Sequence, residues 1–400
     1  MSTPKKVIYF SRQSVVFFRY MLPIWKKTGG IFITESESLY NFVRSHYPNM
    51  ESYCDRRKNL SRYHPGAIVL AGDERKIPPR YKLVQIFHGL ADKRAVYDKR
   101  NFKVRESPLF LISRFIEHHL PGCFHKFSLL SEDMWRPFEL LRMDRLIRNR
   151  YSLFCLTGKH MEDKLRSANV LTKKNWRAIG FPRLDCLANN ELSREEIIED
   201  LKLNPDYKTI LYAPTWHGVG KINLSSIPDL GIKVCQAVGN EVNFIFKPHP
   251  NIIANDEFPE EMRQIGEYIE NHPNFFYPDP KMDTIRLMYI SDLMITDFSS
   301  VAVDYLAFDR PMIFMDHLGE RWDDSDLVEV WIREAGEIVR DPDQIWPTIQ
   351  NSLNDPSKRS KTRQKFRDCF FYSLDGKASD RAAEAILELA GMSGMLPPQK

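Results

Sequence analysis

Short apolar runs that alternate with helical patterns are the feature that most constrains the fold of this chain. The runs are rich in Val, Ile, Leu and Phe, and they lack the apolar-polar alternation of half-exposed strands. Such runs are typical of parallel strands covered on both faces, and their alternation with helices indicates βαβ units. We expect strands at 7–10, 30–34, 67–72, 83–89, 153–158, 176–181, 209–215, 243–248, 274–278, 293–297 and 311–316. We expect helices at 14–27, 37–46, 231–239, 257–271, 299–308 and 377–391.

The length of 400 residues exceeds what one hydrophobic core usually serves, so two domains are expected. A polar, charge-rich segment at 189–208 separates two series of strands and is interpreted as the linker. The sequence therefore predicts an α/β protein with two doubly wound Rossmann-type domains that face an interdomain cleft. Their expected limits are 1–188 and 209–345, with C-terminal helices and a tail at 346–400.

Composition excludes several classes of protein. The net charge is only +4, which offers no overall electrostatic reason to bind nucleic acid. Six cysteines lie far apart without a C-x-x-C pair, which favours reduced thiols over a disulfide framework or a zinc site. No run approaches the roughly 18 apolar residues of a membrane span, and the N-terminus shows no signal peptide. We expect a cytoplasmic protein or one on a membrane surface.

Polar side chains gather where the expected strands end. Ligands of open parallel sheets bind beyond the carboxyl ends of the strands, so these positions are candidates for a site. They are His88, Thr215, His217, Lys247, His249, Thr296, Asp297, Ser299 and Ser300.

Ser299 and Ser300 stand where a strand leads into a helix. Free N–H groups and a partial positive charge at a helix start attract anions, so the two hydroxyls indicate a phosphate or diphosphate site. The alternative is that one serine only caps the helix. In the KPHP segment, Lys247 and His249 are held between prolines, which suits charge stabilisation. The alternative there is an ordinary loop with a solvated lysine.

His88 ends an apolar strand beside a glycine, so it is either a general base or a satisfied core histidine. The basic residues that follow, Lys93 and Arg94 among them, receive an anionic substrate or form a solvated face. The pair Asp323-Asp324 lacks surrounding ligands, and we expect no metal site. P-loop, dinucleotide-binding and nucleophile-elbow motifs are absent from the sequence.

Five segments together resemble one known family. They read FHGLADK (87–93), GFPRLD (180–185), YAPTWH (212–217), KPHP (247–250) and TDFSSVAVDYLAFDRP (296–311). In order and spacing they are similar to the motifs of the CDP-glycerol glycerophosphotransferase family, whose enzymes build teichoic acids and related capsule polymers. The last segment is the most specific of the five.

The resemblance implies a GT-B-like fold with an acceptor-side N-terminal domain and a CDP-donor-binding C-terminal domain. An acceptor hydroxyl would attack the donor's β-phosphorus, pass on the polyol phosphate and release CMP. The implied donor is CDP-glycerol or CDP-ribitol, and the implied acceptor is a polyol-phosphate polymer or glycan, lipid-linked in one variant. No cofactor or metal is implied.

Site residues follow from the same resemblance, position by position. His88 matches the general base, and His249 matches a second histidine near the diphosphate. The implied donor-binding residues are Thr215, His217, Lys247, Thr296, Asp297, Ser299, Ser300 and Arg310. Lys93 and Arg94 are candidates for binding the acceptor, whereas Asp304 and Arg183 are either structural or ligand-binding.

The chain also departs from the family pattern. Phe87 replaces a tryptophan, Leu90-Ala91-Asp92 replaces Thr-Pro-Leu, and His217 stands where an arginine is common. The basic and aromatic segment 108–150 is either a membrane-surface element or an ordinary helical part of the first domain. Two other functions are kept as alternatives: a GT-B glycosyltransferase that uses a nucleotide sugar, and a non-catalytic binder of anionic polymer.

Overall fold

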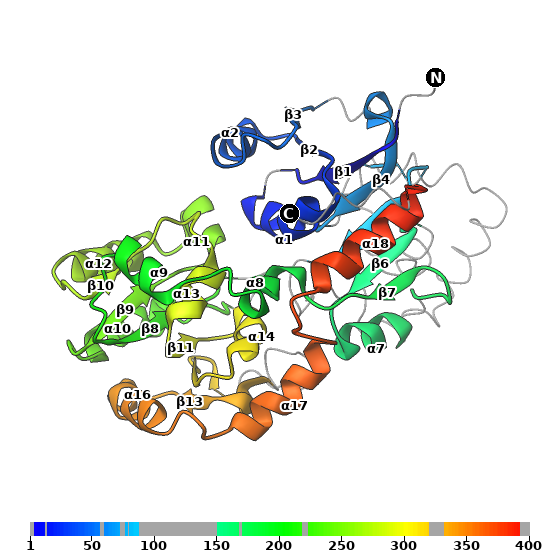
Figure 1. The fold of residues 1–400 in the computed structure, drawn as a ribbon. Coiled ribbons are helices and arrows are strands. Elements are labelled where there is room, and N and C mark those ends of the chain that lie inside the picture. Colours follow the sequence, from blue (N-terminus) through cyan, green and yellow to red (C-terminus); the bar gives the residue numbers. More distant parts are fainter. Residues whose placement is uncertain are drawn as a thin grey trace, which may run out of the picture. The chain divides into compact units, whose positions relative to one another are not determined.

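The chain forms two compact units, each built around its own sheet (Figure 1). The computed structural model describes residues 4–12, 14–56, 60–72, 77–78, 80–87, 150–167, 170–217, 223–319 and 332–392. The described residues up to Asp185 form the first unit together with those from Phe371 onwards. Residues 186–370 form the second unit.

The first unit contains, in its described residues, a seven-stranded parallel sheet with the order β3-β2-β1-β4-β5-β6-β7. Its strands are β1 (Lys6–Phe10), β2 (Ile31–Thr34), β3 (Ser52–Cys54), β4 (Pro65–Leu70), β5 (Leu83–Ile86), β6 (Leu153–Leu156) and β7 (Trp176–Ala178). The strands β1, β2, β5 and β6 are buried along nearly their whole length, which explains their continuous apolar character.

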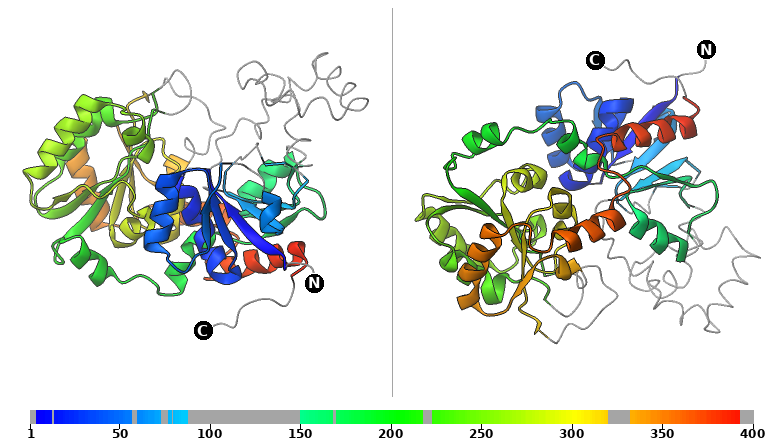
Figure 2. Two further views of the ribbon diagram at one scale, coloured as in Figure 1. Left: turned by 90° about the horizontal axis from the view of Figure 1, so that it is seen from above. Right: turned by 60° about the horizontal axis from the view of Figure 1, so that its bottom comes forward.

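The helices of this unit include α1 (Val15–Thr28), α2 (Glu37–His46), α7 (Lys159–Ser167) and α18 (Ala378–Ala390), with short 3-10 turns η1 (Leu60–Tyr63) and η4 (Pro182–Leu184). Ser14 and Ser36 cap α1 and α2 by accepting backbone N–H groups. Helix α18, red in Figures 1 and 2, packs against α1, so the two ends of the chain complete one layer.

The second unit contains a six-stranded parallel sheet among its described residues, in the order β10-β9-β8-β11-β12-β13. Its strands are β8 (Lys208–Tyr212), β9 (Val242–Phe246), β10 (Phe275–Phe276), β11 (Leu293–Thr296), β12 (Met312–Met315) and β13 (Glu337–Val339). Its helical segments are α9 (Arg194–Asp200), η5 (Ile227–Gly231), α10 (Ile232–Ala237), α11 (Pro250–Ala254), α12 (Pro259–Glu270), α13 (Thr284–Ile290), α14 (Val301–Tyr305), η6 (Leu306–Phe308), η8 (Ile332–Ala335), η9 (Pro342–Gln344), α16 (Ile345–Asn354) and α17 (Ser360–Phe370). A short helix, α8 (Asp185–Ala188), spans the boundary between the units.

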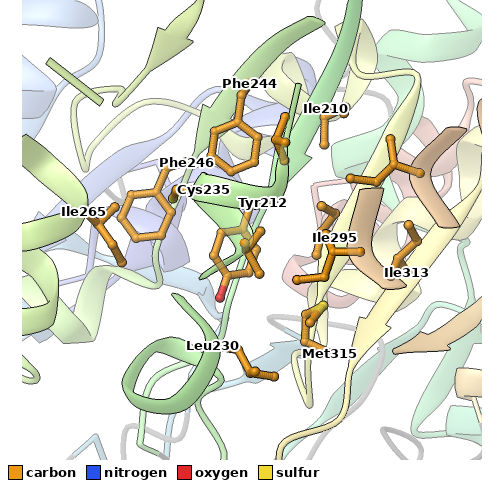
Figure 3. Close-up of a cluster of buried hydrophobic side chains, with 14 of the residues drawn as sticks. Ile210, Tyr212, Leu230, Cys235, Phe244, Phe246, Ile265, Ile295, Ile313 and Met315 are labelled. Carbon is orange, nitrogen blue, oxygen red and sulfur yellow. The ribbon is translucent and has the colours of Figure 1, made fainter. Parts of the chain in front are cut away.

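The core of the second unit lies between its central strands and the helices around them (Figure 3). Tyr212, Phe244 and Phe246 are fully buried there, with the Tyr212 and Phe246 rings 5.6 Å apart. The Tyr212 hydroxyl pairs with Ser226 Oγ at 2.9 Å, so the one polar atom of this ring is satisfied. The core therefore reaches the loops at the carboxyl edge of the sheet.

The strands expected from the sequence are all present, whereas two short strands were missed. β3 and β13 are edge strands that read SYC and EIV, and neither lies in a continuous apolar run of the sequence. The unit boundaries also differ from those expected. Helix α9 begins inside the segment expected to be a linker, because Ile197 and Ile198 bury an apolar face while the charges face outwards. The C-terminal segment expected as one piece is divided between the units at residue 370.

Candidate donor-binding site

The second unit has a topological switch point between β8 and β11. These strands are hydrogen-bonded neighbours, yet the chain continues from β8 to β9 on one side and from β11 to β12 on the other. Such a point leaves room for a ligand beyond the carboxyl ends of the strands. Thr296 ends β11. The other predicted residues follow β8, β9 or β11, so all of them share this edge: Thr215, His217, Lys247, His249, Asp297, Ser299 and Ser300.

Backbone hydrogen bonds tie the loops after these three strands together. The N–H of Lys247 donates to the carbonyl of Tyr212 at 2.8 Å, and the N–H of His249 donates to Pro214 at 3.2 Å. Thr296 Oγ1 donates to the Ala213 carbonyl at 2.7 Å. The hydroxyl of Thr296 therefore holds the loop after β8.

Asp297 is buried and binds backbone donors. Its carboxylate accepts the N–H of Thr215 at 2.9 Å, and both the N–H and the hydroxyl of Ser226 at 2.8 Å. Burial raises the pKa of Asp297, although the bonds from Ser226 and Thr215 and the nearby His317 act against that rise. The geometry makes Asp297 a connector of loops. The sequence analysis did not single out Ser226. The one signal for it in the sequence is its place before Ile227-Pro228, where a helix could begin.

His249 has a defined orientation. Its Nδ1 accepts the N–H of Asn251 at 3.1 Å, which caps α11, and its ring stacks on Trp216 with the centroids 6.0 Å apart. Because Nδ1 is an acceptor, the neutral ring carries its proton on Nε2. Asn251 and Trp216 therefore hold the imidazole of His249 in one orientation at the edge where the strands end.

Ser299 and Ser300 stand at the start of α14. Ser300 is the N-cap residue of the helix, yet its side chain makes no capping bond, while Ser299 Oγ lies 3.5 Å from the N–H of Val301. Ser299 is buried and Ser300 is half-buried. The two hydroxyls thus lie beside the positive end of a helix, as an anion site requires.

His217 is placed by its backbone. Its N–H donates to Glu257 Oε2 at 3.0 Å. Glu257 stands between Asp256 and Phe258, which both adopt positive φ angles of 52° and 54°. A tight, strained turn therefore supports the loop after β8. The supported residue, His217, stands at the position where an arginine is common in the family pattern.

Arg310 and Lys247 contact backbone carbonyl groups. Arg310 Nη1 lies 3.3, 2.7 and 2.5 Å from the carbonyl oxygens of Met288, Tyr289 and Ser291 at the end of α13, and its two N–H groups are shared among them. Lys247 Nζ donates to the carbonyls of Asp279 and Pro280 at 3.1 and 2.7 Å. The structure thus places these two cations on carbonyls of the protein, which favours a structural role for both. Asp304 is buried within α14.

The GFPRLD segment of the first unit holds the C-terminal helix. Asp185 accepts the N–H groups of Ala378 and Ser379 at 3.0 and 2.7 Å, and so caps α18. Arg183 places its guanidinium 4.8 Å from the Tyr20 ring centroid, beside a small cavity at the ends of β5 and β6. Burial raises the pKa of Asp185, with the bonds from Ser379 and Ala378 acting against it. This segment therefore serves the architecture of the first unit.

Other predicted residues lie outside the described part of the chain. They are His88, Lys93, Arg94, the pair Asp323-Asp324 and nearly all of the segment 108–150. Within the described ranges, no cluster of three or more His, Cys, Asp or Glu side chains is arranged to hold a metal ion. No described helix combines the length and apolar character needed to cross a membrane.

Comparison with known proteins decides the family. The family model described as CDP-Glycerol:Poly(glycerophosphate) glycerophosphotransferase matches residues 139–388, which is more than half of the chain. The chain belongs to this glycerophosphotransferase family. The resemblance noted in the five sequence segments is thereby confirmed.

Similar proteins within the family come from teichoic acid synthesis. A teichoic acid poly(glycerol phosphate) polymerase of Bacillus spizizenii is 28% identical over 226 residues, which is 54% of each chain. A teichoic acid poly(ribitol-phosphate) polymerase of the same organism is 27% identical over 54% of this chain and 34% of its own length. The chain thus spans about half or less of the length of these relatives.

A solved structure supports the fold. A variant of the wall teichoic acid polymerase TagF, soaked with CDPG, superposes with a TM-score of 0.64 at 20% identity, covering 97% of this chain and 90% of that one. This likeness shows that the family member described here has the GT-B-like fold that the sequence predicted.

Proposed function

We propose that the chain transfers a polyol phosphate, glycerol phosphate in the first place, from a CDP-linked donor to a hydroxyl of a teichoic-acid-like or capsule polymer. The observation that carries the proposal is that Ser299 and Ser300, after β11, and His249, after β9, lie at the same carboxyl edge of the sheet on either side of β8, in a member of this family. A helix start, two hydroxyls and an oriented imidazole are together suited to a diphosphate.

The reaction transfers one phosphoryl group. A bond forms between the acceptor oxygen and the donor's β-phosphorus, and the bond from that phosphorus to the bridging oxygen breaks. CMP leaves with the bridging oxygen, and the acceptor's proton passes to a base, for which His88 is proposed. Such a reaction depends on positioning and on stabilising the charge of the leaving group, which His249 and the start of α14 would supply.

Three further features belong to this proposal. CDP-ribitol is the alternative donor, because the relatives include polymerases named for either polyol. The reaction is proposed to need no cofactor or metal. We also propose that the protein is located in the cytoplasm and contacts a membrane surface, as expected from the sequence.

Release of CMP tests the proposal. The protein is incubated with CDP-glycerol or CDP-ribitol and a polyol-phosphate oligomer, beside the variants His88→Ala and His249→Ala. We expect CMP release with growth of the oligomer, and a fall of about a hundredfold or more in each variant if a general base and a charge-stabilising donor are lost. Release of CDP or UDP from nucleotide sugars instead would assign a glycosyltransferase. Binding of the oligomer without turnover of any donor would assign a polymer-binding protein.

A further inference from the structure

A buried arginine lies against the loop that carries the two serines. Arg333, in η8, is only 7% exposed. Its guanidinium carbon lies 5.0 Å from the centroid of the Phe298 ring. Phe298 is itself 1% exposed and immediately precedes Ser299. A cation over a desolvated aromatic face is among the stronger contacts of this kind.

Asp316 fixes the position of that arginine. Its side chain is fully buried at the end of β12, and its Oδ2 lies 2.9 Å from Arg333 Nη2. The same oxygen accepts a bond from Arg340 Nε at 2.8 Å, and Oδ1 accepts the N–H of Gly319 at 3.0 Å. The carboxylate therefore keeps two partners if Arg333 is replaced, so a variant at Arg333 does not leave a buried charge alone.

A second contact limits the movement of Phe298. His317, which follows Asp316 in the chain, meets the Phe298 ring edge-on with the centroids 6.0 Å apart. The Nε2 of His317 lies 3.1 Å from the Asn223 carbonyl. That carbonyl is three residues before Ser226, which binds Asp297. Contacts from β12, η8 and the 223–226 segment thus hold both residues that precede Ser299.

We propose that Arg333 is a positioning residue, which holds the Phe298 ring and thereby fixes Ser299 and Ser300 for the diphosphate of the donor. This inference rests on the proposed function, because it assigns a ligand to the two serines. It assigns Arg333 no contact with the substrate. Asp316 serves as the buried anchor of the guanidinium.

The first experiment compares Arg333→Met with Arg340→Met. Both variants remove one partner of Asp316 Oδ2, but only Arg333 contacts Phe298, and the Arg340 side chain is 64% exposed. In Arg333→Met we expect the donor KM to rise about tenfold, equivalent to about 1.4 kcal/mol. The acceptor KM should stay within a factor of two, and Arg340→Met should resemble the wild type in both constants.

Selective change of the donor KM separates positioning from simple destabilisation. Loss of folded protein lowers the active fraction, and so the apparent kcat, without altering KM. Arg333→Lys, which restores a cation but lacks the planar guanidinium, should recover part of the donor KM. An unchanged donor KM in Arg333→Met, or equal changes in Arg333→Met and Arg340→Met, would overturn the inference.

Phe298→Leu provides a second variant that leaves the Asp316–Arg333 pair in place. It removes the aromatic face and keeps an apolar side chain, so it should raise the donor KM by a similar factor. The two changes should be less than additive in the double variant with Arg333→Met, because both remove the contact between Arg333 and the Phe298 ring. Fully additive effects of the two changes would contradict the inference.

Hydrogen exchange of the peptide 293–306 tests the inference without substrate. We expect faster amide exchange in this peptide for Arg333→Met and Phe298→Leu, and wild-type exchange for Arg340→Met. If the wild type turned over no CDP-polyol, the proposed function would fail, whereas the exchange result would still decide the role of Arg333. Unchanged exchange in an active Arg333→Met protein would reject the inference alone.

Discussion

At the scale of single residues, the segment TDFSSVAVDYLAFDRP (296–311) consists of two parts with different roles. Its first part, TDFSS, follows β11 and supplies the two serines at the start of α14. Its second part contains Tyr305 and Arg310, whose side chains both donate to the Ser291 carbonyl at the end of α13. A segment that matches the family motif therefore need not contact the ligand with every one of its residues. The sequence placed Arg310 at the RP position of the family motif, just before β12, but could not show which carbonyls its guanidinium would meet.

Replacement of Arg310 by methionine tests this division. The contacts of the guanidinium with three carbonyls at the end of α13 are lost, so we expect the free energy of unfolding to fall by about 2 kcal/mol. The donor KM should change less than twofold. Urea unfolding and CMP-release kinetics measure the two quantities. Arg286→Met is the control, because Arg286 lies on α13, the helix whose end Arg310 contacts. The ion pair of Arg286 with Asp200 is exposed and should contribute less than about 1 kcal/mol to the free energy of unfolding. A tenfold rise in donor KM without loss of stability would instead make Arg310 a donor ligand.

At the scale of elements, strands were easier to predict than the contacts between elements. The buried strands of a parallel sheet need continuous apolar runs, and these are visible in the sequence. The edge strands β3 and β13 have three residues each and carry no such run. The role of Asp185 as a cap was also invisible, because α18, the helix that it caps, begins at Ala378, almost two hundred residues later in the chain.

The cap of α18 gives a prediction at this scale. Asp185→Ala removes the acceptor of two N–H groups, and we expect the first unit to lose about 1 to 2 kcal/mol of stability. Asp185→Asn keeps an acceptor oxygen for one of the two N–H groups and should cost less than Asp185→Ala. Hydrogen exchange of the peptide 378–390 and urea unfolding measure the effect. Equal losses in the two variants would show that the charge of Asp185, rather than its capping bond, matters.

The dependence on pH sharpens this comparison. Burial raises the pKa of Asp185 above its ordinary value of 3.8 in the folded protein. A raised pKa means that the contribution of the group is fully present below its unfolded pKa and is lost as pH rises through the folded pKa. Asparagine does not titrate in this way. The stability of Asp185→Asn relative to the wild type should therefore improve as pH rises from about 3 towards neutrality. A relative stability that falls over that interval would mean that the folded protein favours the charged form.

At the scale of the whole molecule, the sequence indicated two Rossmann-type domains but not how the chain is shared between them. The first unit takes its last helix from the C-terminus, and α18 packs on α1. The second unit is continuous in its described part from Cys186 to Phe370. The division at 370 has no compositional mark, because α17 and α18 are both amphipathic helices joined by a short segment. Only the packing partners of the two helices distinguish them.

Continuity of the second unit yields the last prediction. All of its sheet pairings and the buried cluster in Figure 3 lie within residues 186–370, so this fragment should fold without the first unit. The serines, His249 and the loops that hold them are also within it, so the fragment should bind CDP with an affinity within about threefold of that of the whole chain. Calorimetric titration measures both affinities, and CDP should raise the melting temperature of the fragment. As a control, the fragment with Ser299→Ala and Ser300→Ala should remain folded and bind CDP about tenfold more weakly. A folded fragment that does not bind CDP would mean that the donor site requires residues of the first unit, and the assignment of the donor to the β8–β11 switch point alone would then be wrong.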